Sequence, residues 1–313
     1  MLAYIVRRIL ATVPVMAVVA LFVFALLHLS PGDPAAIIAG DSATAADIAR
    51  IHHALGLDQP LYVQFGDWVW GLLHGDLGVS IVTNLPVSTL IAQRIEPTVI
   101  LTISTVLVSV LAAIPMGVLA AAKAGSWLDR TVMGFAVLGF SVPVFVIAYV
   151  LIYLFAVRTN LLPVQGFVGI DRGLWPFLSH LVMPTLALAM VFTALIARMT
   201  RTSMLDVLAQ DYIRTAQAKG LANGRVLIGH ALKNAAVPIV TIIGIGFALL
   251  ISGVVVTETV FAIPGLGRLT VDAILSRDYP IIQGIILIFS AGYVLVNLLV
   301  DLSYTFLDPR IRY

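Results

Sequence analysis

The sequence contains no cysteine and few charged residues. Asp, Glu, Lys and Arg make up only 11% of its 313 residues, against about 25% in an average soluble domain, while 60% are apolar. The lack of cysteine excludes disulfides, a thiolate nucleophile and a zinc site built on sulfur. Because a chain this apolar cannot cover its outside with polar atoms, we expect an integral membrane protein.

Motifs for catalysis and for nucleic-acid binding are missing as well. A net charge of only +2 does not indicate a nucleic-acid partner. The sequence has no G-x-x-x-x-G-K-[ST] phosphate loop and no H-E-x-x-H zinc motif. Ser141 lies in Gly-Phe-Ser-Val-Pro, which lacks the second glycine of a G-x-S-x-G nucleophile motif. We therefore expect that the chain itself is not an enzyme and binds no cofactor.

Three histidines near aspartates raise the question of a metal site. His52, His53 and His74 lie near several aspartates in the sequence. Adjacent residues on a helix point to different sides, so His52 and His53 cannot both face one ion. We expect no metal site.

The charged residues leave six long gaps, and a charge at the centre of a membrane span costs about 2.5 to 3.5 kcal/mol. These gaps predict six transmembrane helices, because roughly 20 helical residues cross a bilayer. The runs lack the alternation of a membrane barrel strand, so the predicted fold is all-α. The spans are 9–32, 97–122, 131–157, 173–197, 234–257 and 279–300.

Basic residues predict the orientation. If the N-terminus is cytoplasmic, the inner segments hold twelve Lys and Arg and the outer segments six, which favours both termini inside. Arg7 and Arg8 directly precede the first span. A cleaved signal peptide is the alternative, but the apolar run exceeds a typical signal core and no clear A-x-A site ends it.

The interior of the spans holds hydroxyls and amides but no ionisable group, which disfavours an ion-driven carrier. His28, His180 and Glu258 lie at span edges, where we expect interfacial polar residues. Polar residues that could line a passage are Ser141, Thr241, Ser252 and Asn297, although most such hydroxyls bond to backbone.

The chain divides into three parts on this pattern. Residues 1–32 form the N-terminal cytoplasmic end and the first span, 33–96 form an extracytoplasmic segment, and 97–313 form a core of five spans. Helix and turn signals predict short surface helices after Thr44, from Pro60 to Gly75 and from Pro86 to Ile95.

The longest cytoplasmic stretch, 198–236, predicts a helix, a glycine stop and a second helix. The short helix covers 212–219 and ends at Gly220, and the second begins after Asn223-Gly224. Within the fifth span, Gly244, Ala248 and Ser252 recur every four residues and predict close helix packing, with pore lining as the alternative.

Prolines in the predicted spans indicate where the helices should bend. Pro115, Pro143 and Pro184 lie inside or near the ends of spans and predict kinks.

The stretch Asp-Tyr-Ile-Arg-Thr-Ala-Gln-Ala-Lys-Gly-Leu at 211–221, followed by His-Ala-Leu-Lys-Asn-Ala at 230–235 and Pro238, resembles the EAA loop of ABC importer permeases. The form is that of the first permease of the dipeptide, oligopeptide, nickel and glutathione systems. Arg214-Thr215-Ala216 stands where other importer permeases have Glu-Ala-Ala. Further matches are Pro-Gly-Asp-Pro at 31–34, Leu-Gly-Leu-Asp-Gln-Pro-Leu at 55–61, His-Gly-Asp-Leu-Gly at 74–78, Pro-Gly-Leu-Gly-Arg at 264–268, Arg-Asp-Tyr-Pro at 277–280 and Asp-Pro-Arg-Ile-Arg-Tyr at 308–313.

The resemblance implies the type I ABC importer permease fold in a bacterial inner membrane. It also implies a second, homologous permease, two ATPase subunits that hold ATP and Mg, and an extracytoplasmic binding protein. The short helix would dock in a groove of an ATPase. The residues that the resemblance assigns to this coupling are Asp211, Tyr212, Arg214, Thr215, Ala216, Ala218, Lys219 and Gly220.

Several alternatives stay open at the level of the sequence. Composition alone also fits the short helix as a basic amphipathic helix on anionic lipid. The resemblance favours uptake of di- or oligopeptides, with glutathione or nickel as alternatives within the family. A secondary carrier is the alternative outside it.

Overall fold

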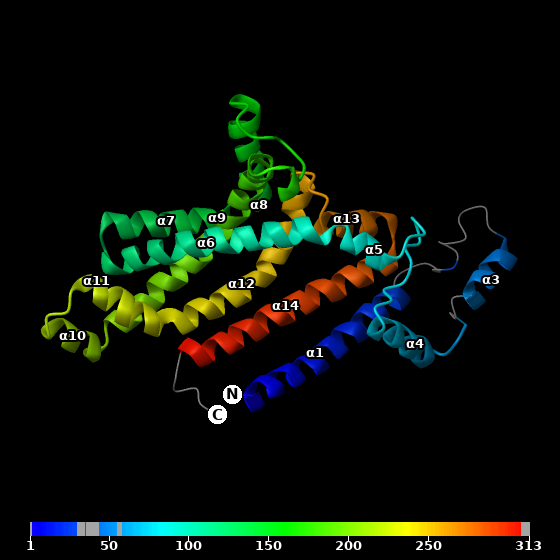
Figure 1. Cartoon of the computed structure of the whole chain (residues 1–313), viewed down its shortest axis with the longest axis horizontal. Helices are drawn as coiled ribbons and strands as arrows, with labels where there is room; N and C mark the ends of the chain where they lie inside the picture. The colour runs from blue at the N-terminus through cyan, green and yellow to red at the C-terminus, as the bar shows by residue number, and fades with distance from the viewer. Residues whose placement is uncertain (1, 30–34, 36–43, 55–57, 308–313) are drawn as a thin grey trace. The chain divides into compact units, whose positions relative to one another are not determined.

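The computed structural model describes residues 2–29, 35, 44–54 and 58–307. Its regular structure is helical, and the one sheet-like pairing within these residues is an isolated bridge between Val79 and Pro86 (Figure 1). The helices are α1 (Leu2–Leu29), α3 (Ala45–Ala54), α4 (Leu61–Leu73), α5 (Val87–Ala92), α6 (Ile95–Ala122), α7 (Trp127–Ser141), α8 (Val144–Leu151), α9 (Leu174–Leu208), α10 (Asp211–Ala218), α11 (Asn223–Arg225), α12 (Lys233–Val260), α13 (Leu266–Ser276) and α14 (Tyr279–Leu307). Two π-helical segments, Ile152–Arg158 and Val226–Leu232, extend α8 and lead into α12, and Ile170–Arg172 is a short 3-10 turn.

Within the described residues, five helical stretches are long and apolar enough to cross a membrane. They are Val6–Leu26, Ile95–Ala122, Leu174–Leu208, Asn223–Val260 and Tyr279–Leu307. A pair of helices that meet at a bend makes a sixth crossing if the pair counts as one span. The all-α membrane fold is therefore confirmed, whereas the sides on which the ends of each span lie stay predicted.

The expected third span, 131–157, is broken rather than kinked. Helices Trp127–Ser141 and Val144–Arg158 meet at 102°. Val142 has an extended backbone (φ −89°, ψ 123°) because the ring of Pro143 disfavours a helical residue before it. Helices α6 and α9 instead continue through Pro115 and Pro184.

The predicted short helices between the first two spans are confirmed as α3, α4 and α5. Pro60 and Pro86 each lie directly before the first turn of a helix, where a missing N–H costs nothing. The matched segments 31–34 and 308–313, and the first three residues of 55–61, lie outside the described residues.

The chain forms two compact units. The first comprises Glu96–Arg268 with the two chain ends, Met1–Ile5 and Leu295–Tyr313, and the second comprises Val6–Ile95 and Leu269–Val294. Helix α9 is the most buried of the membrane-length helices and runs through both apolar clusters of the first unit.

Small residues let other helices approach α9 closely. A Cβ at Gly117 of α6 would lie 2.7 Å from the carbonyl oxygen of Ala197, and one at Gly253 of α12 would lie 2.8 Å from Leu188. The stripe predicted in the fifth span packs closely at one of its three positions, and there against α14 rather than α9. Gly244 is buried against Val300 of α14, whereas Ala248 and Ser252 are exposed.

Glu258, near the end of α12, is fully buried, so the expectation of an interfacial side chain is wrong. Its Oε1 accepts a hydrogen bond from the Thr98 hydroxyl (2.5 Å), and its Oε2 accepts one from the backbone N–H of Arg268 (3.0 Å). The Thr98 hydroxyl accepts a bond from the N–H of Leu266 (2.8 Å). The carboxylate thus holds the turn 264–268 against α6 and α12.

The Pro-Gly-Leu-Gly-Arg motif is explained by this contact. A Cβ at Gly265 would overlap the carboxyl group of Glu258, and one at Gly267 would lie 2.6 Å from the Cα of Val255. Only glycine lets this turn lie directly against the buried carboxylate.

We predict that Gly265→Ala lowers the free energy of unfolding by about 1–3 kcal/mol, because the added methyl group overpacks the turn. The measurement is the Tm of the purified protein in detergent. Gly134→Ala is the matched control, since a Cβ there meets no atom within 4 Å and should leave the Tm unchanged or raise it. Equal Tm values for both variants would contradict the close approach.

In the second unit, α1 packs against α4 and is hydrogen-bonded to the first part of α14. Phe24 of α1 packs against Phe65 and Trp68 of α4, with ring centroids 5.3 and 5.7 Å apart. The side-chain amide of Gln283 in α14 donates to the carbonyl oxygen of Val23 (3.1 Å).

Asp278, directly before α14, organises the loop 79–86 of this unit. Its buried carboxylate accepts hydrogen bonds from the Ser80 hydroxyl (2.5 Å) and from the backbone N–H groups of Ile81 (3.2 Å) and Val82 (3.3 Å). The Arg-Asp-Tyr-Pro motif is therefore a loop anchor in this structure.

Candidate functional site

The predicted short helix of the segment 198–236 is present as α10. Helix α9 continues past the fourth span to Leu208, and Gln210 then takes an extended conformation before α10 begins at Asp211. Helix α10 therefore projects from the end of α9 after a connection of only two residues.

The end of α10 confirms the glycine stop. Gly220 has a left-handed backbone (φ +81°), which glycine adopts without a steric penalty. Its N–H donates to the carbonyl oxygen of Gln217 (2.9 Å), and the N–H of Leu221 donates to that of Ala216 (3.3 Å). This pair of hydrogen bonds is a Schellman motif, and it satisfies carbonyl groups that the end of a helix leaves free.

Ile213 anchors α10 to the first unit, and the sequence prediction did not include it. The side chain is 1% exposed. It belongs to an apolar cluster with Met204 of α9 and with Val226 and Ala231 of the segment that leads into α12. Ile213 is the one large aliphatic side chain in α10, and the sequence therefore offered a way to predict its role. A short polar helix with a single large apolar side chain is expected to pack on the rest of the protein through that side chain.

The opposite side of α10 faces away from the apolar cluster. Tyr212 is 46% exposed, and Asp211, Arg214, Thr215, Ala218 and Lys219 are exposed, whereas Ala216 is half-buried. The ion pair between Arg214 and Asp211 (3.4 Å) is open to solvent and contributes little to stability. The eight residues predicted for coupling thus lie together on and beside one short helix.

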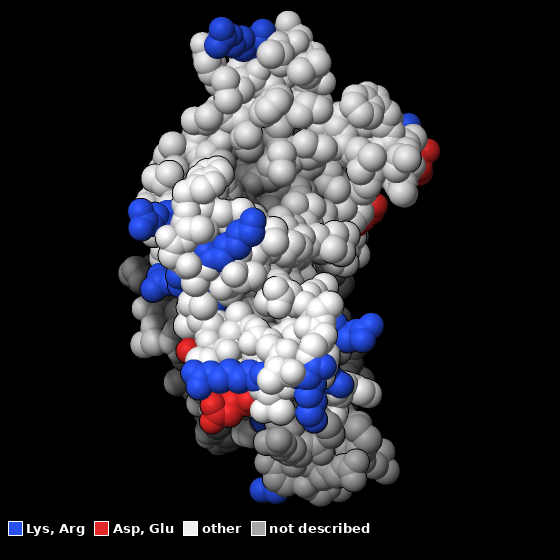
Figure 2. Space-filling model, turned by 90° about the vertical axis from the view of Figure 1, so that its left-hand side faces the viewer, with Lys and Arg blue, Asp and Glu red and all other residues white. Residues whose placement is uncertain are grey.

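The surroundings of this helix are basic. Arg214, Lys219, Arg225 and Lys233 are all exposed in α10 and in the helical segments that follow. Figure 2 shows the face that carries α10 and α11, where blue Lys and Arg side chains predominate over red acidic ones. An acidic surface or an anionic membrane would be attracted to such a face.

The four residues predicted to line a passage lie on three helices: Ser141 ends α7, Thr241 and Ser252 lie in α12, and Asn297 lies in α14. The hydroxyl of Ser141 donates to the carbonyl oxygen of Val137 (2.8 Å), as the alternative of backbone bonding predicts. The hydroxyl of Thr241 donates to Val237 O (2.7 Å) and lies 2.7 Å from the Tyr304 hydroxyl. Ser252 lines a cavity.

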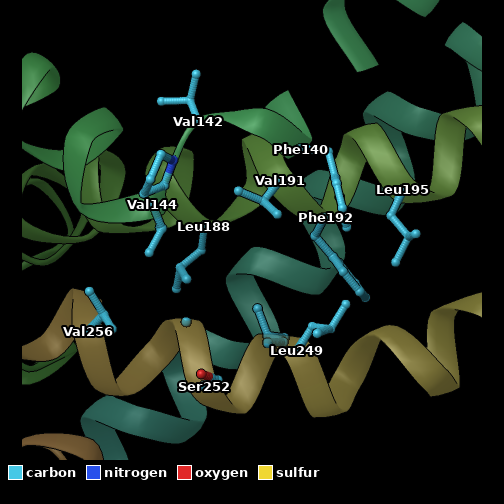
Figure 3. A pocket seen from close by; sticks show the side chains of 13 residues that line it. Phe140, Val142, Val144, Leu188, Val191, Phe192, Leu195, Leu249, Ser252 and Val256 are labelled. Atoms are coloured by element: carbon cyan, nitrogen blue, oxygen red, sulfur yellow. The ribbon is translucent and has the colours of Figure 1, made fainter. Parts of the chain in front are cut away.

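That cavity has a volume of about 290 Å³ and lies beside the break between α7 and α8. Its walls come from three places: the break itself, the middle of α9 and the second half of α12. Figure 3 shows Val142 and Val144 at the break, Val191 and Phe192 of α9, and Ser252 of α12 around the space. The lining is apolar apart from Ser252, so the cavity offers no partner for a charged group.

Two family models match this chain. Residues 113–313 match the model described as the inner membrane component of binding-protein-dependent transport systems, and residues 1–102 match the N-terminal model of the same kind of protein. The chain belongs to this family of permeases.

Relatives match along the whole length of the permease. It is 54% identical over 310 residues to a probable peptide ABC transporter permease protein of Sinorhizobium fredii, with 99% of each chain covered. It is 41% identical to the dipeptide transport system permease protein of Escherichia coli, with 100% of this chain and 99% of the relative covered. The chain is thus the membrane permease component of a binding-protein-dependent importer.

Solved structures support the fold. The permease resembles a chain of the inward-facing MetNI methionine ABC transporter with a TM-score of 0.57 and 17% identity, covering 70% of this chain and 96% of the other. It resembles a chain of an amino acid ABC transporter with histidines with a TM-score of 0.52 and 16% identity, covering 69% and 92%.

We predict that Gly220→Ala loosens the end of α10, because a left-handed backbone costs a residue with a Cβ about 1–2 kcal/mol. Amide exchange at positions 220 and 221 should quicken roughly five- to thirtyfold if these bonds open locally. Gly224→Ala is the control, since Gly224 has neither a positive φ nor a neighbour within 4 Å of its Cβ position. Unchanged exchange in Gly220→Ala would contradict the assigned helix end.

Proposed function

We propose that this permease forms one half of the pathway of an ATP-driven peptide importer. The other half is a second, homologous permease, two ATPase subunits supply energy, and an extracytoplasmic binding protein delivers the substrate. The names of relatives at 54% and 41% identity over nearly the whole chain support peptides as the substrate class. Residues 33–96 are then the extracytoplasmic segment and 97–313 the permease core, in a bacterial inner membrane with both termini cytoplasmic.

Energy enters through α10, which docks in a groove of an ATPase subunit. The observation that carries this step is the two-sided structure of α10: Ile213 fixes one side in the apolar cluster, and the other side has no cover in the described residues. A helix held in this way transmits a displacement to α9 and α12 instead of bending alone. ATP and Mg belong to the ATPase subunits, and this chain supplies neither a nucleotide site nor a catalytic group.

The pathway itself runs along polar side chains of the spans. Ser252 supports this assignment best because its hydroxyl is exposed at a cavity between spans. Ser141, Thr241 and Asn297 complete the proposed lining, and Ser141 and Thr241 have backbone partners that a passing substrate would exchange.

We predict that Ala218→Arg uncouples transport, because a long charged side chain on the exposed side of α10 blocks docking without touching the apolar cluster. The complete complex should insert normally, hydrolyse ATP and lose most uptake per ATP. Ala124→Arg is the control, because Ala124 is equally small and exposed but lies in the loop between α6 and α7. Wild-type uptake per ATP in Ala218→Arg would remove the docking assignment.

The substrate class has its own test. The binding protein that copurifies with the tagged permease is titrated with dipeptides, longer peptides, glutathione and Ni²⁺ in a calorimeter. We expect saturable binding of peptides. Binding of glutathione or Ni²⁺ alone would replace peptides with that solute.

A further inference from the structure

An ion pair outside the predicted coupling residues connects two helices of the first unit. Asp129 lies in the first turn of α7, and Arg201 lies in the part of α9 that leads to α10. The Arg201 guanidinium donates from Nε to Oδ1 (2.5 Å) and from Nη2 to Oδ2 (2.7 Å) of Asp129. The carboxyl group is buried, with Asp129 4% exposed, so this pair differs from the open pair in α10.

Asp129 also determines the structure of the loop before α7. Its Oδ2 accepts a hydrogen bond from the backbone N–H of Gly125 (2.9 Å), where φ is +80°. Its own N–H donates to the hydroxyl of Ser126, the residue that caps α7 (3.4 Å). One carboxylate therefore holds the loop, the start of α7 and α9 together.

The other end of α7 is held on α9 as well. A Cβ at Gly139 would lie 3.1 Å from both the Cβ of Ala194 and the carbonyl oxygen of Met190. Because α7 contacts position 201 near its start and positions 190–194 near its end, it runs antiparallel along α9. Helix α7 is thus fixed to α9 near both of its ends.

Directly after this contact, the chain bends. Helix α8 departs from α7 at 102°, and the apolar cavity of about 290 Å³ lies beside the break, as Figure 3 shows at Val142 and Val144. Close-packed interiors resist rearrangement, so a void at a break in a helix is a place where neighbouring side chains can shift.

We propose that Asp129 and Arg201 are positioning residues for coupling: they make α7 move with α9 and α10, so that a push on α10 reaches the break between α7 and α8. This inference rests on the proposed docking of α10. The two-point geometry of the pair suits this role, because a guanidinium fork fixes both distance and orientation, whereas a lysine would supply only a point charge.

The test replaces the ion pair with a removable covalent link. Since this chain has no cysteine, Asp129→Cys and Arg201→Cys introduce its only thiols, and the wild-type complex treated with the same reagent is the control for thiols on the partner subunits. The complete complex carrying both changes is assayed in proteoliposomes for uptake and for ATP hydrolysis. Each assay is run before and after crosslinking with a short bis-methanethiosulfonate, and again after reduction.

Before crosslinking, we expect the double-cysteine variant to assemble and hydrolyse ATP but to lose at least about fivefold in uptake per ATP. Fivefold is the lower end of the typical coupling between two sites in a protein. Crosslinking should restore the ratio, and reduction should abolish it again. The proposal would be overturned if the uncrosslinked variant had the wild-type uptake per ATP, or if its uptake per ATP stayed low after crosslinking.

Two further variants keep the result interpretable. Arg201→Lys keeps the charge and is expected to assemble, so a lowered ratio there supports the proposal and an unchanged ratio contradicts it even if the double variant fails to insert. Arg130→Gln, at the exposed neighbour of Asp129, should leave the ratio unchanged. If the wild-type complex shows no ATP-dependent uptake, the proposed function itself fails, whereas coupled uptake in all variants removes only the role of the pair.

Discussion

The cost of placing a charge in hydrocarbon determines where this protein can build specific polar contacts. The buried carboxylates described above all lie near the ends of helices: Asp129 at the start of α7, Glu258 near the end of α12 and Asp278 before α14. Each accepts hydrogen bonds from backbone N–H groups of a neighbouring loop or turn. The middles of the spans can then remain apolar and pack through small residues.

This distribution has a functional consequence. In the described residues, spans without ionisable groups at their centres disfavour a relay for protons or ions, which agrees with the proposal that ATPase subunits supply the energy. The proposed point of entry is α10, which is joined to α9 by two residues, anchored by Ile213 and ended by Gly220. The membership of the family of binding-protein-dependent permeases agrees with this arrangement.

Much of this fold could be predicted from the sequence, because charge gaps mark spans and Gly220 marks a helix end. Features that depend on residues far apart in the chain could not. Glu258 looked interfacial because its partner Thr98 lies 160 residues earlier, and the pairing of Asp129 with Arg201 spans 72 residues. Pro143 predicted a kink, but the helix breaks at Val142 and the two helices meet at 102°. Ile213 was overlooked although its apolar side chain stands out within α10.

The central claim is that the permease moves solute only with energy received through α10. The most direct measurement is uptake into proteoliposomes by the complete complex and by the purified permease alone, each with ATP or with an imposed proton gradient. The account predicts ATP-dependent uptake by the complex that persists when a protonophore dissipates the gradient, and none by the permease alone. Concentrative uptake by the permease alone, driven by the proton gradient, would contradict it.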